Sequence, residues 1–168
     1  MFAVPPVAQP MKSPASVPGS SAGHWLTFRI GSQLYAAPLE AVNEVIRDGD
    51  ITPVPGAAAD VLGVRHLRGR IVPVLDGQAR MGVAPAPLDP ASVRIVMLAH
   101  AEHLVGLRVG AVGELLRSDG IEIEPPPPGR SSRRDDPVTG IISWQGGFVA
   151  LLDVSRLCRL GGEAGHVA

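Results

Sequence analysis

The side chains that could carry acid–base or metal chemistry are few and lie far apart in the sequence. His100 and His103 have a spacing seen in metal sites, but they flank Ala101 and Glu102 in a predicted hairpin turn. No cysteine or further histidine lies nearby to complete a coordination shell. A solvated turn is therefore favoured over a metal centre, and we expect no bound metal.

Cys158 is the only cysteine, so the chain cannot form an internal disulfide. A nucleophilic thiol needs a neighbouring base, and the sequence offers none close by. Its position in an apolar pattern near the C-terminus indicates a small buried hydrophobe instead. A chain that does not depend on disulfides is typical of the cytoplasm, where we expect this protein.

Asp76 and Asp153 each precede a short stretch that is compatible with a helix. A pair of catalytic carboxylates is conceivable, and a hydrolase using Asp76 or a histidine stays open as a minor alternative. Two helix N-caps explain both residues without further assumptions, because a capping carboxylate accepts hydrogen bonds from free backbone N–H groups. The chain is therefore expected not to be an enzyme.

Sequence signals for nucleotides, nucleic acids and membranes are weak. The segment from Gly106 to Gly110 lacks the spacing of a phosphate-binding loop. Arg130, Arg133 and Arg134 are followed at once by two aspartates and have no interleaved aromatics. The 15 Lys and Arg against 16 Asp and Glu leave a net charge of -1. No apolar run approaches the ~20 residues that span a bilayer. We therefore expect no cofactor, no nucleic acid and no membrane insertion, and function is expected to lie in binding surfaces.

The chain repeats itself in two blocks. Residues 41–47 reappear 70 positions later as residues 111–117, and the same offset aligns Ile51 with Ile121 and Pro55 with Pro125. A second block, residues 63–76, reappears at an offset of 77 as residues 140–153. The seven extra residues of the second copy are expected in the loop Pro125–Asp136. Two matching blocks in the same order indicate two copies of one folding unit.

Each copy has five short apolar runs separated by turn signals, which is typical of strands. The expected strands are Trp25–Ile30, Gln33–Pro38, Val42–Arg47, Val61–Leu67, Arg70–Leu75, Val93–Ala99, His103–Val109, Val112–Arg117, Gly140–Trp144 and Phe148–Leu152. Five strands suit a small closed barrel, which has no exposed sheet edges. The predicted fold is mostly β, with two packed five-stranded SH3-like barrels, short connecting helices and a C-terminal helix.

The predicted organisation assigns one lobe to each copy. It comprises a disordered leader rich in Pro, Ser and Ala (residues 1–23), a domain (24–160) and a flexible tail (161–168). Within the domain we expect lobe 1 at about 24–85, lobe 2 at about 90–152 and a helix at 153–160. That helix would bury one face formed by Val154, Leu157, Cys158 and Leu160.

One difference between the copies points to a surface. Arg68 stands in the turn of copy one where copy two has Gln145, although the flanking glycines match. Glu44 lies on the strand before that turn. An Arg–Glu pair there would fix the hairpin or meet a partner.

At these residues the chain resembles the CheW family of chemotaxis coupling proteins. The resemblance covers about Trp25 to Leu160 and is carried by residues 28–31, 42–47, 51–55, 105–109 and 139–141, and above all by the run 62–76 with its Gly-Val-x-x-Leu-Arg-Gly-x-Ile-x-Pro-Val core. It implies a non-enzymatic scaffold that binds the regulatory domain of a CheA-type histidine kinase and the cytoplasmic tip of chemoreceptors. Such a scaffold would be recruited to membrane-associated receptor arrays.

The resemblance also implies roles for individual residues. Partner contact is implied for Val42, Glu44 and Arg68, and less directly for Val93 and Leu115. A requirement of backbone geometry is implied for three glycines, Gly63, Gly69 and Gly106.

Two other interpretations stay open from the sequence. The chain could serve a surface-motility pathway or compete with a main adaptor as a paralogue. It could also be an SH3-like peptide-binding module that uses Pro125–Pro128 or the groove between the lobes.

Overall fold

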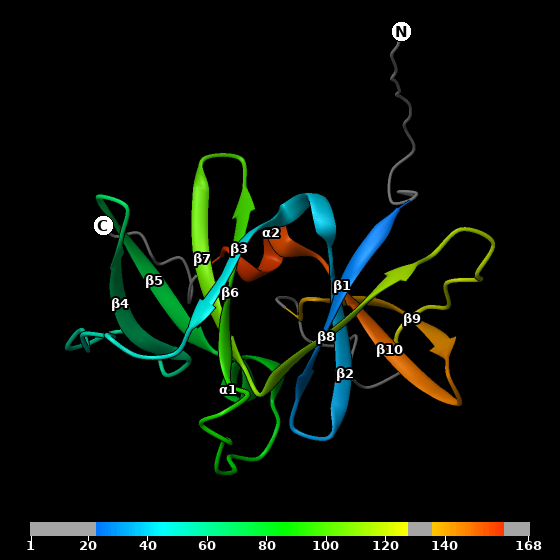
Figure 1. Ribbon diagram of the computed structural model, residues 1–168, viewed down its shortest axis with the longest axis horizontal. Coiled ribbons are helices and arrows are strands. Elements are labelled where there is room, and N and C mark those ends of the chain that lie inside the picture. Colours follow the sequence, from blue (N-terminus) through cyan, green and yellow to red (C-terminus); the bar gives the residue numbers. More distant parts are fainter. Residues whose placement is uncertain (1–22, 128–135, 160–168) are drawn as a thin grey trace, which may run out of the picture.

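The computed structural model describes residues 23–127 and 136–159, and β-strands dominate them (Figure 1). In chain order the elements are β1 His24–Ile30, β2 Gln33–Pro38, the 3-10 helix η1 Leu39–Ala41, β3 Val42–Arg47, β4 Val61–Leu67, β5 Arg70–Asp76, α1 Gly77–Met81, β6 Arg94–His100, β7 His103–Val109, β8 Ala111–Arg117, β9 Val138–Trp144, β10 Gly147–Leu152 and α2 Val154–Leu157. All ten predicted strands are confirmed, with ends that shift by no more than two residues. No helix in the described ranges is long and apolar enough to cross a membrane.

The strands form two five-stranded sheets, and each sheet takes strands from both copies. Sheet A has the order β8-β1-β2-β10-β9, and sheet B has the order β3-β6-β7-β5-β4. The division into lobes at 24–85 and 90–152 is therefore wrong, because the first hairpin of each copy joins the sheet of the other. The short connections η1 and Gly110 carry the chain from one sheet to the other.

The two sheets repeat the same strand register. In sheet A, Ala36 pairs with Leu151 across the parallel β2–β10 contact. Gly106 pairs with Val74 across the parallel β7–β5 contact in sheet B, which is the same pairing displaced by the two sequence offsets. The structure therefore confirms two copies of one unit and shows that they exchange their β1–β2 and β6–β7 hairpins.

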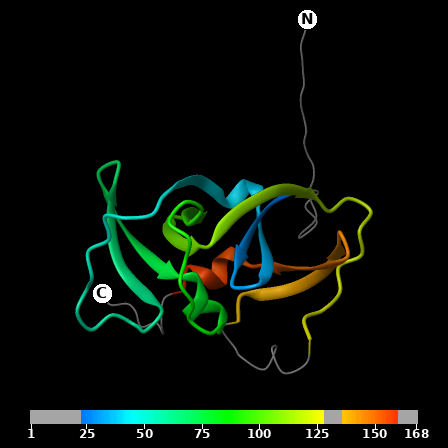
Figure 2. The same cartoon turned by 60° about the horizontal axis from the view of Figure 1, so that its bottom comes forward.

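The hydrophobic core has three parts. Each barrel has a small interior of its own, built around Trp25 in sheet A and Ile95 in sheet B. A larger cluster joins the sheets and includes Phe28, Leu107 and, from α2, Leu157, all fully buried. Helix α2 accordingly lies at the junction of the two barrels (Figures 1 and 2). Because burying one such side chain stabilises a fold by about 1.5–3 kcal/mol, this shared cluster holds the barrels together.

After the third strand of each copy, the chain makes one bridge to the fourth strand. Thr52 bridges Val64, and Glu124 bridges Ile141. Since Val64 and Ile141 are equivalent, Thr52 corresponds to Glu124, 72 positions later. At this bridge the offset is therefore 72 and not 70, although Ile51 and Ile121 still pack against corresponding barrel interiors. Two of the seven extra residues lie between β8 and this bridge, not in the later loop.

Both predicted N-caps are confirmed. A side-chain oxygen of Asp76 accepts a hydrogen bond from the backbone N–H of Gln78 at 3.0 Å, and one of Asp153 accepts from the backbone N–H of Ser155 at 2.9 Å. Helix α2 is shorter than the expected 153–160. The leader up to residue 22, the loop residues 128–135 and the tail from Leu160 lie outside the described residues.

Candidate partner-binding site

The Arg68 and Glu44 side chains form a two-point ion pair at one end of sheet B. Arg68 Nε donates to Glu44 Oε1 and Nη2 donates to Oε2, both at 2.9 Å. This parallel geometry is the strong and directional form of an Arg–carboxylate contact. The Arg68 side chain is 72% exposed, so its other N–H groups face solvent and are open to a partner.

The backbone of Arg68 is held in a conformation that its side chain disfavours. Arg68 and Gly69 have φ values of 51° and 79°, the pattern of a type I′ hairpin turn. Asparagine, aspartate or glycine is the usual first residue of such a turn, because a positive φ strains most side chains. Gln145 has nearly the same φ, 52°, in the equivalent turn, so the exposed and oriented charge, and not the strain, distinguishes Arg68.

The ion pair also shifts both titrations. The Arg68 hydrogen bonds lower the pKa of Glu44 below its usual value, and Glu44 raises the pKa of Arg68. Because the folded-state pKa of Glu44 is lowered, the pair is fully formed above the ordinary glutamate pKa. It is lost only as the pH falls through the lowered pKa, so it is intact at neutral pH.

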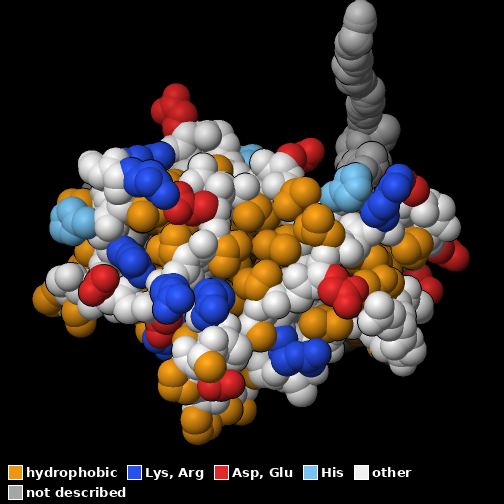
Figure 3. Space-filling model, in the orientation of Figure 1, with side chains coloured by type: hydrophobic (Ala, Val, Ile, Leu, Met, Phe, Trp, Pro, Cys, Tyr) orange, Lys and Arg blue, Asp and Glu red, His pale blue; other side chains and the backbone are white. Residues whose placement is uncertain are grey.

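An apolar surface lies beside this ion pair, along β3 and its equivalent β8. Near the junction of the barrels, the surface is formed by four half-buried residues: Ala41, Val42, Ala111 and Val112. Of these, Val42 and Val112 pack on the shared core. Farther along the strands, Val45 is 39% and Leu115 is 52% exposed. Figure 3 shows apolar side chains gathered in the middle of the face on which β3 and β8 lie. We call these six residues the β3–β8 surface.

Val93 does not belong to this surface. Its side chain is only 5% exposed, and its amide donates to the Asp89 carbonyl at 3.0 Å. It precedes β6, where the chain enters the barrel, and burial there leaves nothing for a partner to touch. The expectation that Val93 contacts a partner is therefore not supported, whereas Val42, Glu44, Arg68 and Leu115 are accessible.

The three glycines occupy places where a side chain is costly. A Cβ at Gly63 would overlap the carbonyl oxygen of Thr52, and the Gly63 φ is 153°. At Gly106 a Cβ would come within 2.8 Å of the Ile95 side chain in the core. Gly69 has open space around it, and only its φ of 79° favours glycine. The close contacts at Gly63 and Gly106 and the positive φ at Gly69 support a structural role for all three.

Gly63→Ala is expected to destabilise the protein by about 3 kcal/mol, because the added methyl meets backbone and cannot be accommodated by a side-chain movement. Gly69→Ala is the matched control. It adds the same methyl at a positive φ but in open space, and is expected to cost about 1 kcal/mol. Denaturant unfolding of both variants measures the difference. Equal losses in the free energy of unfolding would show that the backbone at Thr52 moves to accommodate the added methyl at no cost.

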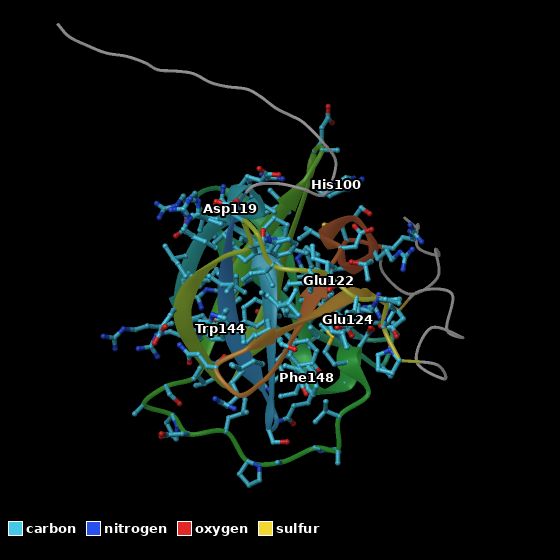
Figure 4. All side chains as sticks on the ribbon, turned by 90° about the vertical axis from the view of Figure 1, so that its right-hand side faces the viewer. His100, Asp119, Glu122, Glu124, Trp144 and Phe148 are labelled. Carbon is cyan, nitrogen blue, oxygen red and sulfur yellow. The ribbon has the colours of Figure 1, made fainter. Side chains whose placement is uncertain are left out.

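The two most exposed large apolar residues were not predicted from the sequence. Ile71 is 63% and Phe148 is 59% exposed, and they are equivalent positions just after the two type I′ turns. Figure 4 shows Phe148 and Trp144 at the sheet A end of the molecule. Strand alternation was the available signal, since Ile71 faces away from the buried Val72 and Val74.

The residues first considered for chemistry are not brought together. His100 and His103 pair across the β6–β7 turn, and the described ranges contain no group of three or more potential metal ligands. Burial raises the pKa of the Cys158 thiol to about 11, so it stays protonated and a poor nucleophile at neutral pH.

This geometry defines a class: a duplicated two-barrel β protein with an exposed ion pair beside an apolar surface. Comparison with known proteins identifies its family. The CheW-like domain model matches residues 24–161. Chemotaxis protein CheW of Rhizobium meliloti is 32% identical over 79% of this chain and 84% of its own length, and protein FrzA of Myxococcus xanthus is 30% identical over 79% and 82%. The crystal structure of the scaffolding protein TtCheW from Thermoanaerobacter tengcongensis matches with a TM-score of 0.68 and 28% identity, covering 77% of this chain and 88% of that one.

The chain belongs to the CheW family. This is a family of chemotaxis scaffolds without catalysis of their own, so the protein is an adaptor and not an enzyme.

Proposed function

We propose that this protein couples chemoreceptors to a CheA-type histidine kinase. In this proposal it binds the regulatory domain of the kinase and the cytoplasmic tip of the receptors, and it works in the cytoplasm at membrane-associated receptor arrays. The family supports the pathway. The β3–β8 surface beside the Arg68–Glu44 pair supports a site for the receptor tip.

The observation that carries the proposal is the combination of an apolar strip and an oriented charge. Val45 and Leu115 offer exposed apolar area, and Arg68 offers a guanidinium fixed by two hydrogen bonds to Glu44. An amphipathic helix binds such a surface through one apolar stripe and gains direction from a charge at its edge. A receptor tip built of helices fits these requirements.

The proposed mechanism is geometrical. Receptor and kinase held on one rigid two-barrel body are kept at a fixed distance, and many weak contacts within an array act together through high effective concentration. Signalling then requires that the two receptor states differ in how well they engage the adaptor, because a partner with equal affinity for both states transmits nothing. The shared core cluster supplies the rigidity that this mechanism needs.

The direct test is a pull-down of the purified protein with the regulatory domain of each CheA-type kinase of its genome, with and without receptor tip fragments. Selective capture of one kinase, strengthened by the tip, is expected, and the identity of that kinase distinguishes a flagellar from a surface-motility pathway or a competing paralogue. A folded protein that captures no kinase would contradict the proposal and favour the peptide-binding module.

Val42→Asp is expected to weaken binding of the receptor tip about tenfold or more, since a charge desolvated on an apolar contact costs roughly 2 kcal/mol. Binding of the kinase domain should change little. Isothermal titration calorimetry measures both. Leu115→Asp tests the same surface at a more exposed position where folding is not at risk.

Ser143→Asp is the control, because its side chain is exposed on β9, a strand that is not part of the β3–β8 surface. It adds the same charge outside the apolar strip and should leave receptor binding within about twofold. If Val42→Asp and Leu115→Asp variants melt normally and bind the tip as the wild type does, the receptor tip does not use this surface.

A further inference from the structure

The β3–β8 surface has two equivalent halves. Ala41, Val42, Val45 on one side and Ala111, Val112, Leu115 on the other are the same positions of the two copies. Strand β3 pairs with β6 as β8 pairs with β1, in the same register and with the bulge at the same place. In Figures 1 and 2, β3 and β8 lie on the same side of the molecule, one on each barrel. On its apolar contacts alone, this surface would accept a helix in either of two opposite directions.

The charges do not repeat between the halves. At the β4–β5 and β9–β10 turns and at the two bridges, three exposed positions are more positive in sheet B: Arg68 against Gln145, Arg70 against Gly147, and Thr52 against Glu124. Sheet B also carries the exposed Asp48 and Asp50 after β3, and these are paired with Arg108 and Arg65, each at 3.9 Å. Figure 4, which faces the sheet A end, shows Asp119, Glu122 and Glu124 there. The sheet B end of the surface is therefore the more positive, and the sheet A end is the more negative.

The two equivalent glutamates show the difference most clearly. The Glu44 carboxylate is neutralised by Arg68. Glu114, its equivalent on β8, has an exposed side chain, and no cation of the described residues forms an ion pair with it. Gln145 occupies the Arg68 position and brings no charge. A partner thus meets a guanidinium at one end and a free carboxylate at the other.

We propose that this charge difference sets the direction in which a helix lies across the β3–β8 surface. The occupant is one amphipathic helix, with its C-terminal, acidic end beside Arg68 and its N-terminal, basic end beside Glu114. The helix dipole adds to the side-chain charges, since the C-terminal end of a helix is negative and the N-terminal end positive. The inference rests on the proposed receptor-binding function and specifies the polarity of that complex.

The two turns allow the charge to be moved without changing the backbone. Arg68 and Gln145 have φ values of 51° and 52°, and Gly69 and Gly146 both have 79°. The double variant Arg68→Gln with Gln145→Arg keeps the composition and net charge. It places a guanidinium where it can reach Glu114 as Arg68 reaches Glu44, and it leaves Glu44 free.

The test is directional cross-linking of a receptor tip fragment that carries one cysteine at the acidic end of its binding helix. The adaptor carries Cys158→Ser and a single reporter, Arg47→Cys or Arg117→Cys, which are equivalent exposed strand ends. A bismaleimide of fixed length then joins the tip to whichever reporter is near. The measured quantity is the ratio of cross-linked product at 47 to that at 117.

With the wild-type turns, the cross-linked product at 47 should exceed that at 117 by ~3-fold or more, which is the effect expected of one or two exposed ion pairs. The exchanged variant should favour the reporter at 117, and salt should flatten both ratios. A ratio that the exchange leaves unchanged, or equal yields in the wild type, overturns the inference while leaving receptor binding in place. If the wild-type protein does not bind the tip in calorimetry, the proposed function fails and the inference with it. The single variants Arg68→Gln and Gln145→Arg give the same comparison if the exchanged protein melts early.

Discussion

Neither half of this chain is expected to fold alone. A fragment of residues 23–90 lacks the strands β8, β9 and β10 on which its first hairpin is built, and a fragment of residues 91–159 lacks β3, β4 and β5. An isolated two-stranded hairpin is marginal in water, and each fragment would also expose half of the shared core. Each fragment alone should therefore show no cooperative thermal transition, and an equimolar mixture should regain one.

Circular dichroism melts and amide exchange measure this directly. The matched control is the chain cut once between residues 90 and 91 after folding, which contains the two halves already assembled and should stay folded. Barrels that form independently in the separate fragments would contradict the exchanged hairpins.

Arg68→Asn is expected to weaken coupling about tenfold while leaving the fold as stable as before or slightly more so. Asparagine followed by glycine is a favoured type I′ turn, so the substitution relieves the positive φ of Arg68 while it removes the guanidinium. The exposed charge and its bond to Glu44 are lost together. Dissociation constants for the receptor tip and the kinase regulatory domain, with a thermal melt, separate recognition from folding.

Gln145→Asn is the control for that experiment, because it makes the same improvement in the equivalent turn of the other barrel. It should leave binding unchanged. An Arg68→Asn protein that binds both partners and activates the kinase normally would show that the ion pair only braces the hairpin.

Local features of the fold could be predicted from the sequence. The ten strands follow from apolar runs between turn residues, and the two caps follow from Asp76 and Asp153 standing before short helical stretches. The Arg68–Glu44 pair was foreseen because one copy has a charge that the other lacks. Each of these depends on residues close in sequence or on the comparison of the two copies.

The exchange of hairpins could not be predicted in the same way. An alignment of the copies is identical whether each hairpin pairs within its own copy or with the other one. Only the short connections at Leu39–Ala41 and Gly110 hinted at it. The burial of Val93 was missed because the family resemblance gives a position but not its local packing. The correspondence between Thr52 and Glu124 was missed, because the two inserted residues lie in a loop that has no repeated motif to align.

The exchanged hairpins also bear on how such a protein could arise. If the two copies were separate chains, the same strand pairing would make a domain-swapped homodimer, in which both surfaces are identical by symmetry. Fusion into one gene keeps that architecture but frees the two halves to mutate separately. Arg68 and Gln145 are an example of such a difference between the halves. A symmetric ancestor would have presented the same face twice, whereas the fused chain can present two different faces to two different partners.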